Sequence, residues 1–175
     1  MLRILTAFFI ALPVIAAAAP QQFKTVTALM DEYNDYSNDA GTFKVISEAP
    51  LKIQISPKVF SGDSDKTIEV ASYKASVYAA YRTLLQTPAI EVNVTIVPLS
   101  FDLSKHEKRY LKDKKFSFTV TKEKVFKLAH SFAGTANPDG IIGIDGYEWT
   151  DNFSSCCYLE SGHPGVVKFA HQLLK

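Results

Sequence analysis

The most unusual local feature of the sequence is a pair of adjacent cysteines, Cys156 and Cys157, which are the only cysteines in the chain. Two cysteines in an oxidising compartment favour a disulfide. Neighbouring Cα atoms lie ~3.8 Å apart, closer than in most disulfides, so this bond requires a tight turn and cross-links nothing distant. Three other interpretations stay open: thiols that pair with another chain, a metal or nucleophile site, and inert buried thiols.

Thiol chemistry would require an imidazole beside one of the two sulfurs. Cys157 could be a nucleophile with His163 or His130 as its base and Asp151 or Glu160 to orient the imidazole. Cys157 with His163 defines our alternative hypothesis of a small exported thiol-dependent hydrolase or redox-linked enzyme. Zinc would draw on Cys156, Cys157, His163 and His171, but their spacing matches no zinc pattern. The sequence also lacks G-x-S-x-G, S-x-x-K, H-E-x-x-H, C-x-x-C and phosphate-loop motifs. We therefore favour a protein without catalytic activity, metal or cofactor.

The cysteines lie in a glycine-rich, aromatic and acidic stretch, residues 140–165. Between Leu128 and Val167 there are five acidic residues and no lysine or arginine. Aromatic side chains in such a loop can anchor a protein partner or a sugar ring, and long connections of this kind are often functional. The alternative is that the aromatic residues fold back onto the core. The candidate binding residues are Tyr147, Trp149, Phe153 and Tyr158.

A basic run forms a second candidate surface. Between Lys105 and Lys127 there are nine basic and three acidic residues, a local balance of +6. This run would suit an anionic surface, although a solvated connection between two strands is the interpretation that we favour. The candidate anion-binding residues are Lys105, Lys108, Arg109, Lys112, Lys114 and Lys115.

The first eighteen residues have the layout of a secretory signal. Arg3 precedes an apolar run, and small residues follow, with Ala16 and Ala18 spaced for a signal peptidase. The run is short for a membrane span and contains Pro13. We predict cleavage after residue 18, with export to the periplasm or outside of a bacterial cell. Residues 19–175 are then formally neutral, which argues against a nucleic-acid binder.

Hydrophobic periodicity predicts how these candidates are positioned. Helices are expected at 22–37, 64–86, 122–133 and 164–174, and strands at 42–47, 51–56, 90–97, 116–121 and 141–144. No internal repeat or linker divides them, so residues 19–175 form one domain. This order predicts an α+β two-layer sandwich, with an antiparallel or mixed sheet of about four to five strands and helices mainly on one face.

Taken together, these features predict an exported accessory module without catalytic activity. It would bind another protein of the cell envelope, as an inhibitor, an immunity-type protein or an assembly component does. The thiol-dependent enzyme and attachment to an anionic surface through Lys105–Lys115 are the alternatives. We expect no nucleic-acid partner and no membrane span once the signal is removed. The sequence does not define the oligomeric state.

Overall fold

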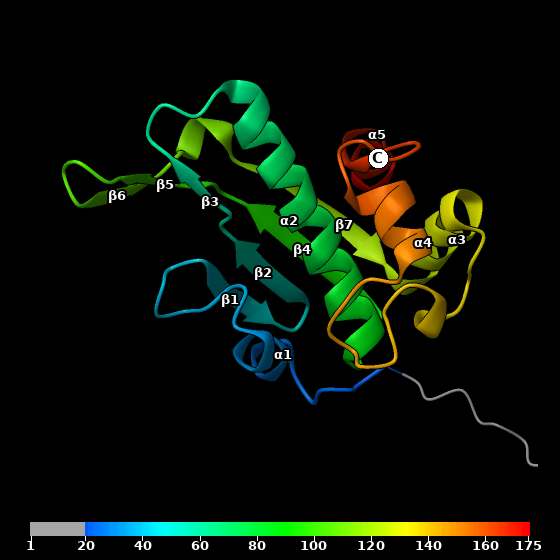
Figure 1. Ribbon diagram of the computed structural model, residues 1–175. Helices are drawn as coiled ribbons and strands as arrows, with labels where there is room; N and C mark the ends of the chain where they lie inside the picture. The colour runs from blue at the N-terminus through cyan, green and yellow to red at the C-terminus, as the bar shows by residue number, and fades with distance from the viewer. Residues whose placement is uncertain (1–19) are drawn as a thin grey trace, which may run out of the picture.

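The computed structural model describes residues 20–175, and its helices and strands form a single α+β domain (Figure 1). The predicted signal segment, residues 1–18, lies outside the described residues. Within residues 20–175, no helix combines the length and the hydropathy needed to cross a membrane.

The main sheet contains four strands in the order β1-β2-β4-β7. These strands are β1 (Phe43–Glu48), β2 (Leu51–Ile55), β4 (Glu91–Ile96) and β7 (Phe116–Thr121). β2 and β4 are parallel, whereas β1 pairs with β2, and β4 with β7, in antiparallel fashion. The sheet is thus mixed, as the sequence predicts.

Alternation along the strands gives this sheet one apolar and one polar face. Val92 and Val94 on β4 are fully buried on the helix-covered face. On the other face Asn93 donates to Thr119 at 2.9 Å, and the hydroxyls of Thr95 and Ser117 lie 2.9 Å apart. Because that polar face satisfies its own hydrogen bonds, the domain has two layers, with helices mainly on one side.

The long helix α2 (Asp65–Gln86) is the centre of the helical layer, and it crosses the sheet diagonally in Figure 1. The Ser64 hydroxyl caps its first turn by accepting from the Thr67 amide at 3.1 Å. Tyr81 and Leu84 are fully buried. Three other helices contact α2: α1 (Val26–Tyr33), α3 (Lys122–Ala133) and α5 (Val166–Leu174). A helix with neighbours on so many sides is well placed to hold a polar side chain away from water.

A second, three-stranded sheet extends from one end of the main sheet. Its order is β3-β5-β6, with β3 (Lys58–Phe60) parallel to β5 (Leu99–Asp102) and β6 (Glu107–Tyr110) antiparallel to it. Hydrophobic periodicity predicts one sheet only and gives no signal for this one, because β3 is short and all of β6 is exposed. A single turn of 3-10 helix, η1 (Lys112–Lys114), leads from β6 to β7.

Between α3 and α5 the chain contains only short elements. These are η2 (Pro138–Gly140), α4 (Asp151–Phe153) and the π-helical turn η3 (Ser154–Tyr158). The strand predicted at 141–144 is wrong, since only an isolated bridge between Ile142 and Trp149 forms there. The helix predicted at 22–37 is shorter, because Asn34 adopts a left-handed conformation with φ 54° that ends α1.

Candidate functional site

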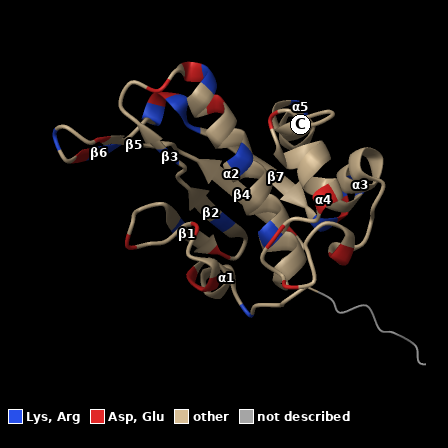
Figure 2. Ribbon diagram, viewed as in Figure 1, with Lys and Arg blue, Asp and Glu red and all other residues tan. Residues whose placement is uncertain are grey.

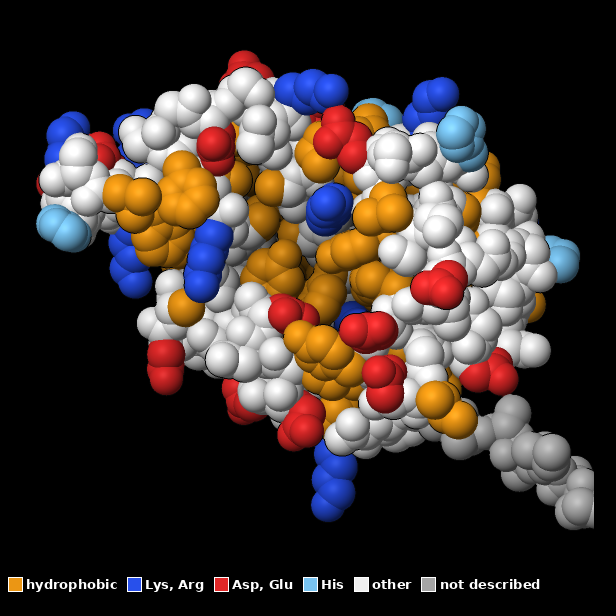
Figure 3. Space-filling view, in the orientation of Figure 1, with side chains coloured by type: hydrophobic (Ala, Val, Ile, Leu, Met, Phe, Trp, Pro, Cys, Tyr) orange, Lys and Arg blue, Asp and Glu red, His pale blue; other side chains and the backbone are white. Residues whose placement is uncertain are grey.

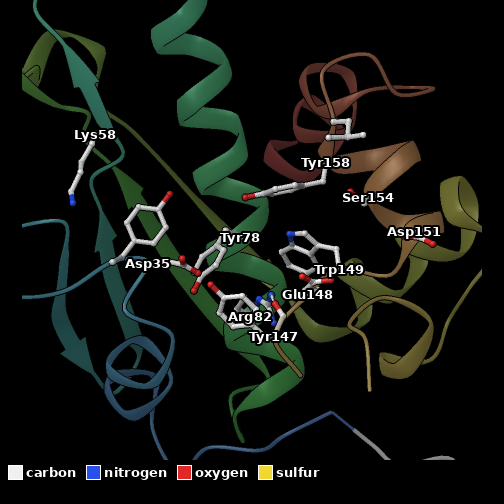
Figure 4. A pocket seen from close by; sticks show the side chains of 12 residues that line it. Asp35, Lys58, Tyr78, Arg82, Tyr147, Glu148, Trp149, Asp151, Ser154 and Tyr158 are labelled. Atoms are coloured by element: carbon white, nitrogen blue, oxygen red, sulfur yellow. Dashed lines mark hydrogen bonds between the residues drawn. The ribbon is translucent and has the colours of Figure 1, made fainter. Parts of the chain in front are cut away.

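An open cleft of about 620 Å³ lies over α2. One wall comes from the segment after α1 together with β3, and the other comes from the segment around α4 and η3. Figure 3 shows this hollow with hydrophobic side chains on its floor, and Figure 4 shows the residues that line it. The lining residues are Asp35, Tyr36, Lys58, Tyr78, Arg82, Tyr147, Glu148, Trp149, Asp151, Ser154, Tyr158 and Leu159.

The floor of the cleft contains a buried arginine. Arg82 is 3% exposed and lies one helical turn after Tyr78, which is 4% exposed, so both side chains share one face of α2. Its guanidinium donates to the carbonyls of Gly146, at 2.5 Å, and Tyr147, and to the Gln86 side chain at 3.1 Å. Arg82 therefore holds the segment around Gly146 against α2.

Aromatic rings surround this guanidinium. Its central carbon lies 4.4 Å from the ring centre of Trp149, 5.0 Å from that of Tyr33 and 5.7 Å from that of Tyr78, all within cation–π range. No carboxylate of residues 20–175 forms an ion pair with it. Burial lowers the pKa of Arg82. The cation is thus stabilised by carbonyl oxygens and aromatic faces.

Trp149 mainly packs within the wall of the cleft and offers little ring surface for a ligand to stack on. The side chains of Arg82, Phe153 and Tyr158 pack around its indole, with ring centres 5.2 Å and 5.3 Å away for the two aromatic residues. Tyr78 and Tyr81 also contact it through near-perpendicular ring contacts. With so much of the indole covered, Trp149 is poorly placed to stack on a sugar ring.

The mouth of the cleft is acidic. Asp35, Glu148 and Asp151 are exposed, and no ion pair forms to any of them within the described part of the chain. The exposed Lys58 is the cation that lines the opposite wall. Tyr147, which is 49% exposed, is the most open aromatic residue of the lining. The accessible surface thus combines aromatic rings with an excess of carboxylates.

A buried hydroxyl faces this acidic mouth. The Tyr78 hydroxyl has no hydrogen-bond partner among the residues described. Burial, and then the nearby Asp35 carboxylate, raise the pKa of Tyr78, so the hydroxyl stays protonated at neutral pH. Figure 4 shows the two side chains close together beside Arg82. A neutral hydroxyl can still donate or accept one hydrogen bond.

The structure brings together three of the four aromatic residues that the sequence suggests for binding. Tyr147, Trp149 and Tyr158 all line the cleft. Phe153 does not. It is fully buried between Tyr81, Trp149 and Phe169, so it belongs to the core beneath the cleft. The prediction for Phe153 is therefore corrected: a side chain with no exposed surface cannot contact a partner.

The two cysteines lie at disulfide distance within η3, directly before Tyr158. Cys157 is fully buried, His163 is exposed, and no hydrogen bond joins them in the described structure. A sulfur held in a disulfide is no nucleophile, so the thiol-enzyme alternative loses its reactive group in this state. No group of three or more His, Cys, Asp or Glu side chains within residues 20–175 is arranged to hold a metal ion.

The paired state of the cysteines gives a direct prediction. The intact mass of the native protein should rise by two hydrogen masses after reduction under denaturing conditions, because one disulfide becomes two thiols. A thiol-reactive probe should label neither cysteine before reduction, since both are buried and bonded. Labelling of Cys157 in the native, unreduced protein would restore the thiol-enzyme alternative.

The basic candidates lie on β6, on η1 and on the connections beside them, away from the cleft (Figure 2). Lys105 pairs with Asp102 at 3.6 Å, and Lys114 pairs with Asp65 at 2.9 Å. The other four, which form no ion pair within the described residues, are Lys108, Arg109, Lys112 and Lys115. The structure thus places the first half of the run on the β5–β6 hairpin and the second half on the η1 connection that leads to β7.

The other half of the cleft is not predicted by sequence patterns; it comprises Asp35, Tyr36, Lys58, Tyr78 and Arg82. Arg82 could be identified from the sequence, because it is the only charged residue among the last twelve residues of α2. A lone charge in an otherwise buried helical segment points to a polar site or an internal anchor.

Comparison with protein-family models, with curated proteins and with solved structures finds no match to this chain. The class of the protein therefore rests on its own geometry: a single α+β domain with one aromatic, acid-rimmed cleft over its central helix.

Proposed function

We propose that this protein is an exported, non-catalytic binding module of a bacterial cell envelope, and that the cleft over α2 holds its protein partner. The signal-like residues 1–18 support export. The observation that carries the binding role is the cleft itself, where exposed aromatic surface adjoins carboxylates that form no ion pair within residues 20–175. Such a mixture of aromatic and polar surface is typical of protein-binding hot spots.

The decisive residue for a test is Tyr147. It is 49% exposed at the mouth, and its hydroxyl makes no hydrogen bond within the described structure, so its truncation leaves the fold largely intact. Trp149 is a poorer choice because its indole supports Arg82 and Phe153. Ile144 is the matched control: it is 76% exposed on the same segment but does not line the cleft.

Cross-linking in cells followed by purification should recover a stoichiometric envelope partner. We expect Tyr147→Ala to weaken binding of that partner roughly tenfold, the size of the loss of a hot-spot aromatic, while Ile144→Ala binds as the unchanged protein does. The measurement is the affinity of each variant for the recovered partner. Equal affinities for the two variants, or no partner at all, would contradict the proposal.

A second candidate function is attachment to an anionic surface through the β5–β6 hairpin. Leu103, at the turn of this hairpin, is 72% exposed beside Lys105, so an apolar tip adjoins the basic run. Binding to anionic vesicles that weakens steeply with added salt would support it.

A further inference from the structure

We infer that the partner presents a lysine or arginine side chain to the cleft, and that the Asp35 carboxylate and the Tyr78 hydroxyl receive its cationic head. This inference rests on the proposed function, because it specifies the chemistry of the partner segment that the cleft holds. It goes beyond that function in naming the subsite and the side chain that occupies it.

The charges around the cleft favour a cationic guest. Among the described residues, three exposed carboxylates line it, from Asp35, Glu148 and Asp151, together with one exposed ammonium, from Lys58. The ammonium of the half-buried Lys74 lies just outside the lining, 5.9 Å from the ring centre of Tyr158. Arg82 adds a positive charge on the floor, but this charge lies beneath aromatic rings and its guanidinium already donates to two carbonyls and an amide oxygen. The surface that a partner meets first therefore attracts cations.

Tyr78 provides the second, independent observation. Tyr78 is 4% exposed, it lines the cleft, and its hydroxyl makes no hydrogen bond among the described residues. Such a hydroxyl carries a desolvation penalty that a suitable ligand removes. The Asp35 carboxylate lies close to this hydroxyl (Figure 4), and Asp35 is itself exposed. A carboxylate and a neutral hydroxyl side by side are two acceptors for one ammonium or guanidinium.

The shape and lining of the cleft fit a long basic side chain. A cavity of about 620 Å³ accommodates several methylene groups, and Tyr36, Tyr147 and Tyr158 supply aromatic surface along its walls. Lysine and arginine pack their methylenes on such surface while their charged heads reach polar groups. A carboxylate guest is disfavoured, because the unpartnered Nε of Arg82 is enclosed and the accessible rim is acidic.

The test uses the fact that Trp149 is the only tryptophan of the protein and lies in this cleft. Its fluorescence should change saturably when the purified protein is titrated with an end-blocked peptide of alternating glycine and lysine, or glycine and arginine. A matched peptide with acetylated lysines should cause no saturable change. Added salt should weaken the binding of the lysine peptide, since the attraction is between charges near the surface.

Two variants assign the subsite. We expect Asp35→Asn to weaken the lysine peptide about tenfold, whereas Asp39→Asn, an exposed acid outside the cleft in the same loop, has no effect. Tyr78→Phe should weaken binding several-fold without lowering the melting temperature, since it removes a hydroxyl that has no partner. A purely structural role would instead change stability and leave peptide binding intact.

The outcomes separate this inference from the proposed function. Equal binding of lysine and acetyl-lysine peptides, or equal affinities of Asp35→Asn and Asp39→Asn, would overturn the inference. If the cross-linked partner still depends on Tyr147 in that case, the proposed function stands and the partner uses apolar contacts. If the unchanged protein captures no partner but binds lysine peptides through Asp35, the cleft recognises cations and the protein-binding function fails.

Discussion

Replacement of Arg82 by methionine should lower the free energy of unfolding by about 3 kcal/mol, the largest effect that we expect from a single substitution. The variant loses the charge-assisted hydrogen bonds to the carbonyls of Gly146 and Tyr147. Gly146 keeps two donors, from Tyr33 at 2.6 Å and Gln86 at 2.9 Å, but the Tyr147 carbonyl loses its partner. The bond to Tyr147 is partly buried, and a hydrogen bond from a charged donor contributes about 1.5–3 kcal/mol.

An opposing effect limits this loss. Arg82 is a buried cation without an ion pair, so methionine also removes a desolvation penalty. We expect the hydrogen bonds and the aromatic contacts to outweigh that gain, because the guanidinium makes three hydrogen bonds and lies against three rings. Urea unfolding measures the difference. Lys66→Met is the matched control, since Lys66 is exposed near the start of the same helix and pairs only with Glu160.

Arg82→Lys separates the effect of the charge from that of the hydrogen-bond geometry, because it keeps the positive charge and removes the planar guanidinium. One ammonium cannot reproduce three donors in the guanidinium geometry, so we expect it to lose nearly as much stability as methionine. An unchanged unfolding free energy in Arg82→Met would show that the buried charge is as costly as its contacts are favourable. Arg82 would then contribute no net stability, although it still holds the carbonyls of Gly146 and Tyr147.

Alkaline pH should destabilise the protein by up to roughly 4 kcal/mol for each pH unit above 10. Burial is the main cause that raises the pKa of three tyrosines far above the ordinary value of 10.0, namely Tyr36, Tyr78 and Tyr81. The folded state therefore retains protons that the unfolded state releases. Each such group contributes stability that is complete below pH 10 and is lost as the pH rises toward its folded pKa. Arg82, whose pKa burial lowers, opposes this trend by one proton at most.

The measurement is the unfolding free energy in urea at several pH values between about 9 and 11, together with tyrosinate absorbance. We expect these tyrosines to ionise only as the chain unfolds, in a single cooperative step. Tyr78→Phe should reduce the slope by about one third, and its own stability at neutral pH should not fall, because its hydroxyl has no partner. Gradual ionisation of the buried tyrosines before unfolding would contradict the prediction.

Local patterns in the sequence predict the main sheet and its central helix well. Val92 and Val94 alternate with polar neighbours in β4, and the Ser64 cap and Pro88 bracket α2. The three-stranded sheet has no such signal, because β6 has the sequence Glu-Lys-Arg-Tyr and no residue of it is buried. Its pairing depends on the neighbouring strand β5, which no periodicity within β6 reports.

Only one wall of the candidate cleft, formed by residues 147–159, could be predicted from the sequence. Composition indicates Tyr147 and Trp149 as binding residues but does not distinguish them from Phe153, because burial depends on what α2 and α5 place beneath the loop. Asp35 and Tyr78 belong to other elements, and only the tertiary fold brings them together. Arg82 is the exception, because a single charged residue in a buried stretch of helix indicates a polar site from local sequence alone.

The two walls of the cleft come from distant parts of the chain: one from residues 35–58, and the other from residues 147–159. Synthesis runs from the N- to the C-terminus, so the residues of the first wall and of the floor are made long before those of the second wall. The carbonyls that Arg82 binds are absent until the last quarter of the chain has arrived. A partner that recognises the assembled cleft therefore distinguishes the folded chain from one that still lacks residues 147–159, without any separate mechanism for inspection.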